Sequence, residues 1–214
     1  MYHALLDLGD VLINVDNAKH MRRLQELMPA YMAEQIDATI NKGEEGITLR
    51  HQLDCGVINF DQYQCGFEQM FRVSIDPEVF KSIYTARLTL NTPVVNLFKT
   101  LAQNRVLKKI VLVSNTDWVS FTRALELLMR AQMQIDHVVV SYVVGARKPD
   151  PAMFSAALEI AHARPEECFF VDDKMENVEA ARGLGILGIH YRAGKEGAQQ
   201  FLLNDLEKLH ISCS

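Results

Sequence analysis

The chain alternates short apolar runs with longer segments whose apolar residues recur three or four positions apart. The short runs are typical of buried strands in a parallel sheet. They cover Ala4–Leu6, Ile110–Val113, His137–Ser141, Phe169–Val171 and Ile186–His190. Helical spacing appears between and after them, as over Trp118–Arg130 and Phe201–Leu209. Strands that alternate with helices predict an α/β fold, with a Rossmann-like, doubly wound parallel sheet covered by helices on both faces.

The segment between the first and second apolar runs has a different pattern. Its apolar residues follow helical spacing throughout, at Met21, Leu24 and Leu27, then Met32, Ile36 and Ile40, then Phe60, Tyr63, Phe67 and Phe71, then Val79, Phe80 and Ile83. Asn59 with Gln62 suits a capping pair, and Asp76 before Pro77 suits a helix start. The pattern predicts an all-helical cap over residues 16–91, inserted into a core domain formed by residues 1–15 and 92–214.

Polar side chains follow the first two predicted strands. Asp7 follows the first run and precedes Gly9, while Ser114, Asn115 and Thr116 follow the second. The carboxyl ends of parallel strands meet at one edge of the sheet, where ligands bind. Hydroxyl and amide groups at that edge suit the oxygens of a phosphate, so Ser114 and Asn115 are predicted to bind one.

Two further segments add charge to the same edge. Lys148 precedes Pro149 and a helix start at Asp150, where it would hold a fixed positive charge. Asp172 and Asp173 are adjacent at the end of another strand and repel each other unless a cation neutralises them. Oxygen ligands favour a hard ion such as Mg²⁺. The pattern predicts a magnesium site at Asp172 and Asp173, at the same edge of the sheet as Asp7.

The order and spacing of these segments resemble the motifs of the haloacid dehalogenase-like (HAD) superfamily of phosphohydrolases, in its helical-cap branch. The motifs fall, in chain order, on Asp7 with Gly9, on Ser114, on Lys148, and on Asp172 with Asp173 followed by the helical sequence NVEAARGLG. Each motif alone also fits an ordinary strand end or helix cap. All four in this order fit the superfamily, which implies a cap that closes over the site and selects the substrate.

The resemblance implies a mechanism and assigns roles to the residues. Asp7 is expected to attack phosphorus and form a phospho-aspartyl intermediate, with Ser114 and Lys148 binding the remaining phosphoryl oxygens. Mg²⁺ is expected on Asp7, the Gly9 carbonyl and Asp173, with Asp172 bound directly or through water. A further residue, Asn177, is expected to position Asp173 or the loop of Lys148.

Gly9 departs from the pattern of most phosphatases of this superfamily, which carry there a second Asp that acts as general acid and base. Loss of such a group typically costs about 10²–10⁴ in rate. Three hypotheses follow. In the first, the substrate needs little acid assistance, as with a sugar phosphorylated at its anomeric oxygen, and DLGDV resembles the DLGxV subgroup that includes α-D-glucose-1-phosphate phosphatase. The protein is otherwise a 2-haloacid dehalogenase, which works without metal, or a non-catalytic relative that binds phosphate or a protein. Asp10 is a possible substitute acid.

Within the predicted cap, the segment Thr48–Val57 gathers polar residues. Arg50, His51 and Gln52 stand together there, with Asp54 close by. On a cap loop they would contact the non-reacting part of a substrate. The alternative is a solvated turn between two helices, and the pattern does not separate the two.

Composition limits the class of protein. The chain has 214 residues, 49% of them hydrophobic, and a formal net charge of −5, which argues against a nucleic-acid or anionic-membrane surface. The four cysteines lack metal-site spacing and suggest free thiols in a reducing compartment. No segment resembles a signal peptide, and no run approaches the roughly 20 apolar residues of a membrane span. We expect a cytoplasmic monomer or homodimer that acts on a small phosphorylated metabolite.

Overall fold

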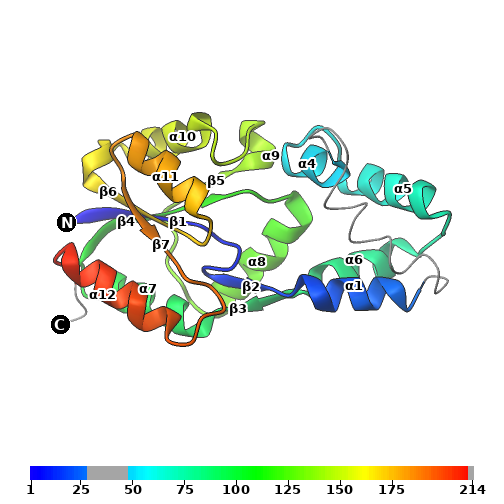
Figure 1. Ribbon diagram of the computed structural model, residues 1–214, viewed down its shortest axis with the longest axis horizontal. Coiled ribbons are helices and arrows are strands. Elements are labelled where there is room, and N and C mark those ends of the chain that lie inside the picture. The colour runs from blue at the N-terminus through cyan, green and yellow to red at the C-terminus, as the bar shows by residue number, and fades with distance from the viewer. Residues whose placement is uncertain (28–47, 212–214) are drawn as a thin grey trace.

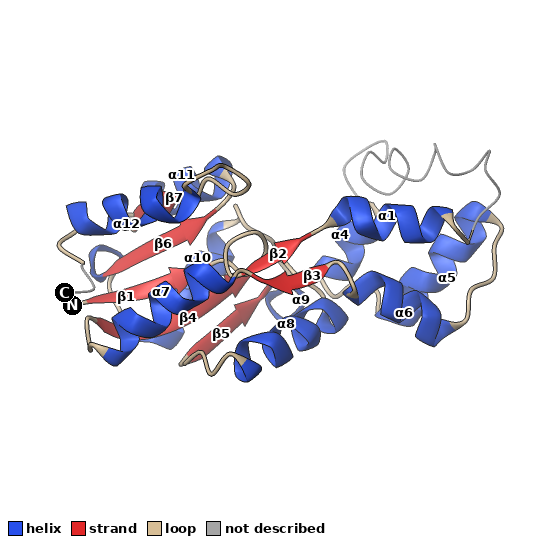
Figure 2. Ribbon diagram, turned by 90° about the horizontal axis from the view of Figure 1, so that it is seen from below, coloured by secondary structure: helices blue, strands red, loops and turns tan. Residues whose placement is uncertain are grey.

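The computed structural model describes residues 1–27 and 48–211, and its centre is a parallel sheet of five strands (Figure 2). The strand order is β5-β4-β1-β6-β7, so β1 is the middle strand. The strands are β1 (Tyr2–Leu6), β4 (Leu107–Ser114), β5 (His137–Val140), β6 (Cys168–Asp172) and β7 (Leu187–His190). All four strand pairs are parallel. The predicted fold class is confirmed, and Asp7 follows the central strand.

Helices cover both faces of this sheet, as the alternation of strands and helices predicts. One face packs against α7 (Thr92–Gln103), α8 (Trp118–Arg130) and α12 (Ala198–Lys208). The other packs against α10 (Pro151–Ala161) and α11 (Met175–Gly183). Successive side chains of β1 point to opposite faces, so Leu6 joins the first layer and Leu5 the second. Two short elements, α9 (Ser141–Val144) and the 3₁₀ turn η1 (Pro165–Glu167), complete the core.

The inserted cap lies beyond the carboxyl ends of the strands (Figure 1). Its described helices are α1 (Asn17–Gln25), α4 (Leu49–Asp54), α5 (Phe60–Phe71) and α6 (Pro77–Thr85). Aromatic residues dominate its own apolar cluster, including Phe67, Phe80 and Tyr84. The capping box of Asn59 and Gln62 and the Asp76 cap of α6 are present. The helix predicted around Met32, Ile36 and Ile40 lies outside the described residues.

A small antiparallel ribbon joins cap and core, and the sequence did not predict it. Strand β2 (Ile13–Val15) pairs with β3 (Leu88–Leu90), with Ile13 opposite Leu90. The expectation of an all-helical insert is therefore wrong at residues 88–90. Three-residue strands are too short to show periodicity, and more than 70 residues separate the partners. The division at residues 15/16 and 91/92 stays a prediction.

In the described part of the chain, none of the helices is both long enough and apolar enough to cross a membrane. Cys55, Cys65 and Cys168 are free thiols, as expected from their spacing, and Cys213 lies outside the described residues.

Candidate active site

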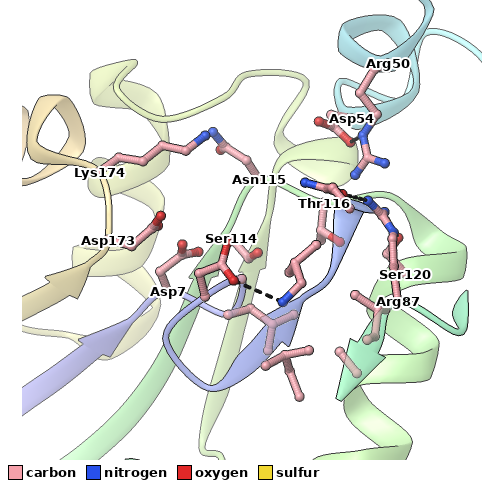
Figure 3. Close-up of a pocket in the computed structure, with 18 of the residues that line it drawn as sticks. Asp7, Arg50, Asp54, Arg87, Ser114, Asn115, Thr116, Ser120, Asp173 and Lys174 are labelled. Atoms are coloured by element: carbon pink, nitrogen blue, oxygen red, sulfur yellow. Dashed lines mark hydrogen bonds and ion pairs between the residues drawn. The ribbon is translucent and has the colours of Figure 1, made fainter. Parts of the chain in front are cut away.

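The carboxyl ends of β1, β4 and β6 face the cap across a cavity of about 260 Å³. Core residues line one side of it, among them Asp7, Ser114, Lys148 and Asp173. Figure 3 shows Asp7, Ser114 and Asp173 converging from three segments, while Arg50 and Asp54 reach in from helix α4 of the cap. The cavity therefore lies between the two parts of the molecule, where the sequence predicted a site.

The ammonium group of Lys148 lies at the centre of the charged groups. It is 2.7 Å from Oδ1 of Asp7 and 2.7 Å from Oδ2 of Asp172, and it donates to the Val113 carbonyl at 2.6 Å. The Lys148 side chain is 1% exposed, so these contacts are shielded from water. Segments that are distant in sequence thus bring the predicted nucleophile and the predicted lysine into direct contact.

The two adjacent acids point in different directions. Asp172 is fully buried and accepts bonds from Lys148, from the Lys174 amide and from the Asn177 side chain. Asp173 is half-buried and lines the cavity. The structure therefore gives Asp172 the role of anchoring Lys148, and leaves Asp173 facing the cavity.

Asn177 contacts a different residue from the one that the sequence predicted. Its amide nitrogen donates to the two oxygens of Asp172 at 3.0 and 3.1 Å, so it holds Asp172 and not Asp173 or the Lys148 loop. It is 2% exposed and not a helix surface residue. Its side-chain oxygen has no hydrogen-bond partner within the described chain. His190, the last residue of β7, contacts the Asp173 carbonyl through Nε2 at 2.9 Å.

Burial and mutual repulsion govern the protonation of these acids. Burial raises the pKa of Asp7 to about 7, Lys148 opposes this rise, and the charge of Asp172 adds to it. Burial and Asp172 also raise the pKa of Asp173. Burial alone would lower the pKa of Lys148, but Asp7 and Asp172 outweigh it and raise that pKa. One ammonium contacts two of the three carboxylates, Asp7 and Asp172, and the ionised cluster therefore has fewer positive than negative charges.

These donors fit a divalent cation. Asp7, Asp172 and Asp173 each offer a carboxylate oxygen, and the three atoms lie within 4.8 Å of one another. With Lys148, the ionised groups carry a net charge of −2, which a divalent ion neutralises. Carboxylate oxygens without sulfur or imidazole suit Mg²⁺.

Two polar residues stand at the end of β4 and at the start of the loop that follows it. Ser114, the last residue of β4, is 2% exposed and lines the cavity, and its contact with phosphate stays a prediction. Asn115 also lines the cavity, but its amide group donates to the Lys148 carbonyl at 2.9 Å and accepts from the Lys148 amide at 2.7 Å. Both ends of the Asn115 side chain therefore contact the lysine loop and help to position it, and its predicted contact with phosphate stays a prediction.

Gly9 and Asp10 form the turn after Asp7. Gly9 lines the cavity, and its backbone forms an isolated β-bridge with Ile13. Asp10 adopts a left-handed backbone conformation, with φ of 54°, and its Oδ1 accepts from the Val15 amide at 3.0 Å. The geometry makes Asp10 a turn-stabilising residue, because one carboxylate oxygen is bound to the turn itself. Asp10 also lines the cavity, and the hypothesis that it replaces the missing acid stays a prediction.

The polar segment of the cap is a helix and not a solvated turn. Thr48 caps α4, and Asp54 at its end is 2% exposed. Arg50 and Asp54 line the cavity, whereas His51 and Gln52 are absent from its lining. His51 instead contacts Arg147 through Nδ1 at 3.2 Å. Of the three predicted cap contacts, the structure brings only Arg50 to the cavity.

A family comparison agrees with this arrangement. Residues 3–185 match the model of the haloacid dehalogenase-like hydrolases. The chain belongs to this family. The predicted superfamily and enzyme class, hydrolase, are confirmed.

Relatives of this HAD-like hydrolase include enzymes and solved structures. It is 26% identical over 206 residues to bifunctional epoxide hydrolase 2 of Rattus norvegicus, covering 88% of this chain and 36% of that protein. A phosphatase from Mycobacterium tuberculosis is 38% identical over 87 residues, 40% of this chain and 39% of that protein. The chain spans about a third of the length of the first curated relatives it matches.

The fold recurs in a HAD family enzyme from Bacteroides thetaiotaomicron, solved in complex with magnesium and inorganic phosphate. The TM-score is 0.77 at 23% identity, and the superposition covers 94% of this chain and 99% of that one. At this identity the likeness establishes the shared fold.

Several residues in or beside the cavity of this HAD-like hydrolase were not predicted from its sequence: Tyr84 and Arg87 belong to the lining, and Asp117 contacts Tyr84. Arg87 donates to the Tyr84 carbonyl, Asn17 and Ser120. Asp117 caps α8 and is 1% exposed, and it accepts from the Tyr84 hydroxyl at 2.7 Å. A usable signal was present for Asp117, which follows the strand-end residues Ser114–Thr116 and precedes a helix. Arg87 and Tyr84 carried none, because their partners are distant in sequence.

Acid should destabilise the HAD-like hydrolase partly through His20, a buried residue of α1. Burial lowers the pKa of His20 to about 4, whereas an unfolded histidine has a pKa near 6.5. The His20 imidazole therefore binds a proton more readily in the unfolded chain than in the folded one. Its contribution to the free energy of unfolding falls as the pH drops from 6.5 towards 4. At pH 5 the expected loss is about 2 kcal/mol. Urea unfolding at pH 7.5 and pH 5 should show this difference in the wild type and not in His20→Gln; equal pH dependence would contradict it.

Proposed function

We propose that this HAD-like hydrolase is a Mg²⁺-dependent phosphatase that removes phosphate from a small phosphomonoester. One observation carries the proposal: a buried lysine ammonium lies 2.7 Å from both Asp7 and Asp172, at a cavity that Asp173 also lines. A carboxylate beside a fixed ammonium and a cation site is suited to attack on a phosphate, because the positive charges offset the repulsion between two anions.

The proposed reaction has two steps. A carboxylate oxygen of Asp7 attacks phosphorus, the ester P–O bond breaks, and the alcohol leaves with a proton from solvent or cavity water. Water then attacks the phospho-aspartyl group, which releases inorganic phosphate and restores Asp7. Lys148 and the Ser114 hydroxyl neutralise and orient the phosphoryl oxygens. Asp7, Asp173 and the Gly9 carbonyl would hold Mg²⁺, with Asp172 in support; the bound ion would supply charge neutralisation at the phosphoryl group.

The substrate class follows from two features. The cavity of about 260 Å³ is closed on one side by cap residues, which suits a small metabolite. Gly9 supplies no acid to protonate the leaving group, which favours a substrate whose leaving group departs easily without a proton. A sugar phosphorylated at its anomeric oxygen is such a substrate, in line with the α-D-glucose-1-phosphate phosphatase resemblance. A small phosphorylated metabolite as partner, a monomeric or homodimeric state and a cytoplasmic location stay predictions.

The similar proteins support phosphate chemistry. The Mycobacterium tuberculosis relative is a phosphatase, and the Bacteroides thetaiotaomicron enzyme was solved with magnesium and inorganic phosphate. The acidic trio of Asp7, Asp172 and Asp173 counts against a metal-free dehalogenase. The retained Asp7–Lys148 pair counts against a purely binding role, because a binding module has no need of a nucleophile.

Removal of the metal tests this proposal. Phosphate release from p-nitrophenyl phosphate and from a panel of sugar phosphates should fall at least about tenfold in EDTA and return with added Mg²⁺. The control is the same assay with Ca²⁺-saturated EDTA. Chloride release from a 2-haloacid in EDTA would favour the dehalogenase instead. Absence of both activities would contradict a catalytic function.

A further inference from the structure

Two charged side chains of the cap, one helical turn apart on α4, contact the core. Arg50 Nε donates to Asp54 Oδ1 at 2.9 Å, which joins them into a pair. In Figure 3 both side chains extend from α4 towards the cavity. The Asp54 side chain is 3% exposed and that of Arg50 is 22% exposed, so the pair is largely withdrawn from water.

Arg50 connects the cap to the loop that follows β4. Its second terminal nitrogen lies 3.5 Å from Asp117 Oδ2, and its first donates to the Tyr84 hydroxyl. Tyr84 in turn donates to Asp117 at 2.7 Å. Burial alone would raise the pKa of Asp117, but Arg50 and hydrogen bonds from Ser120 and Tyr84 outweigh it and hold that pKa below its usual value. Asp117 therefore stays charged and keeps its contact with the cap.

Asp54 connects the cap to the loop that carries Lys148. Its Oδ2 lies 3.4 Å from a terminal nitrogen of Arg147, the residue immediately before the lysine. The other terminal nitrogen of Arg147 contacts His51. The guanidinium of Arg147 is thus held between two residues of α4, and a shift of α4 would move the residue next to Lys148.

The two core loops are also tied to each other. Asn115, two residues before Asp117, brackets the Lys148 main chain with both ends of its amide. The contacts form a closed ring that runs from Arg50 to Asp117, through Asn115 to the lysine loop, and back through Arg147 to Asp54. Removal of one partner leaves the other charge largely shielded from water and unpaired, so the ring favours a single arrangement of both loops.

We propose that Asp54 and Arg50 are positioning residues. Their ion pairs with Arg147 and Asp117 of the core set the position of the Lys148 loop. The inference rests on the proposed function of Lys148 in phosphoryl transfer. The cap then acts on catalysis through the core loops as well as through any contact with substrate. Misplacement of a catalytic group by about 1 Å can cost on the order of 10²-fold in rate.

Asp54→Asn tests this directly, because it keeps the shape and removes the charge that faces Arg147. The Lys148 amide, which bonds to Asn115, should exchange its hydrogen at least about tenfold faster than in the wild type. With p-nitrophenyl phosphate, kcat should fall about tenfold or more while KM changes little, because a displaced Lys148 slows the chemical step more than it weakens substrate binding.

Further variants separate positioning from stability. Arg147→Gln breaks the same pair from its more exposed side and carries the test if Asp54→Asn does not fold. Arg147→Lys keeps the positive charge and should recover part of both effects. The matched control is Lys108→Gln, which breaks the 3.2 Å ion pair with Glu167 outside the cavity and should leave kcat and Lys148 exchange unchanged.

The outcomes distinguish this inference from the proposed function. Folded Asp54→Asn and Arg147→Gln proteins with wild-type exchange at Lys148, or with wild-type kcat in an active enzyme, would overturn the positioning role. A wild type that hydrolyses no phosphomonoester would overturn the proposed function, and the exchange comparison would still decide whether α4 holds the lysine loop.

Discussion

Replacement of Asp7 by asparagine is expected to abolish phosphate release, with kcat falling on the order of 10³-fold or more. The carboxylate oxygen is the only group of Asp7 that can form a bond to phosphorus, and the amide of asparagine is a poor nucleophile. The change also removes one of the three acids that would hold Mg²⁺. Steady-state kinetics with p-nitrophenyl phosphate, at saturating Mg²⁺, measures the effect.

The fold of Asp7→Asn should survive, which makes the loss of activity interpretable. Lys148 keeps its partner Asp172 at 2.7 Å, so its ammonium is not left unpaired. Burial disfavours the Asp7 carboxylate, as its raised pKa indicates, and a neutral side chain avoids that cost. Asp61→Asn, on the exposed side of α5, is the matched control and should retain full activity. Hydrolysis by Asp7→Asn at the wild-type rate would remove Asp7 from the mechanism.

The strand ends show why much of this site was predictable from sequence. Parallel strands meet at a single edge, so an acid after Leu6 and acids after Val171 must lie close together once their runs are assigned to strands. The Leu6–Val171 register places Asp7 beside Asp172, and both share Lys148. The Asp150 and Pro151 start of α10 likewise follows from local preferences, because each residue satisfies a helix end by itself.

The parts that could not be predicted depend on contacts between distant segments. Arg50 and Asp117 are 67 residues apart, and no local sequence pattern shows that these two side chains pair with each other. Asn177 was placed near the acids, yet which acid it holds depends on the turn at Lys174 and not on spacing. The paired strands β2 and β3 have three residues each, and tertiary pairing alone defines them.

Gly9→Asp is expected to raise the rate for substrates with poor leaving groups, by about 10²–10⁴-fold for alkyl phosphates. An acid two residues after Asp7 would protonate the departing oxygen and later deprotonate the attacking water. The backbone accepts the change: Gly9 is not in a left-handed conformation, and a Cβ there would meet Val15 Cγ2 at 3.7 Å, an ordinary contact. The rate should rise much less for substrates whose leaving group departs without a proton, such as p-nitrophenyl phosphate.

The decisive measurement is the dependence of kcat/KM on leaving-group pKa, across a series of aryl and alkyl phosphates, for the wild type and Gly9→Asp. The wild type should show a steep decline with rising leaving-group pKa, and Gly9→Asp a shallow one, because general acid catalysis removes the charge that develops on the leaving oxygen. Gly9→Asn has nearly the same shape and cannot donate in this way, so it should keep the steep decline. An equal gain for all substrates, or the same slope in all three proteins, would mean that Gly9 limits the reaction through the shape of the turn and not through a missing proton donor.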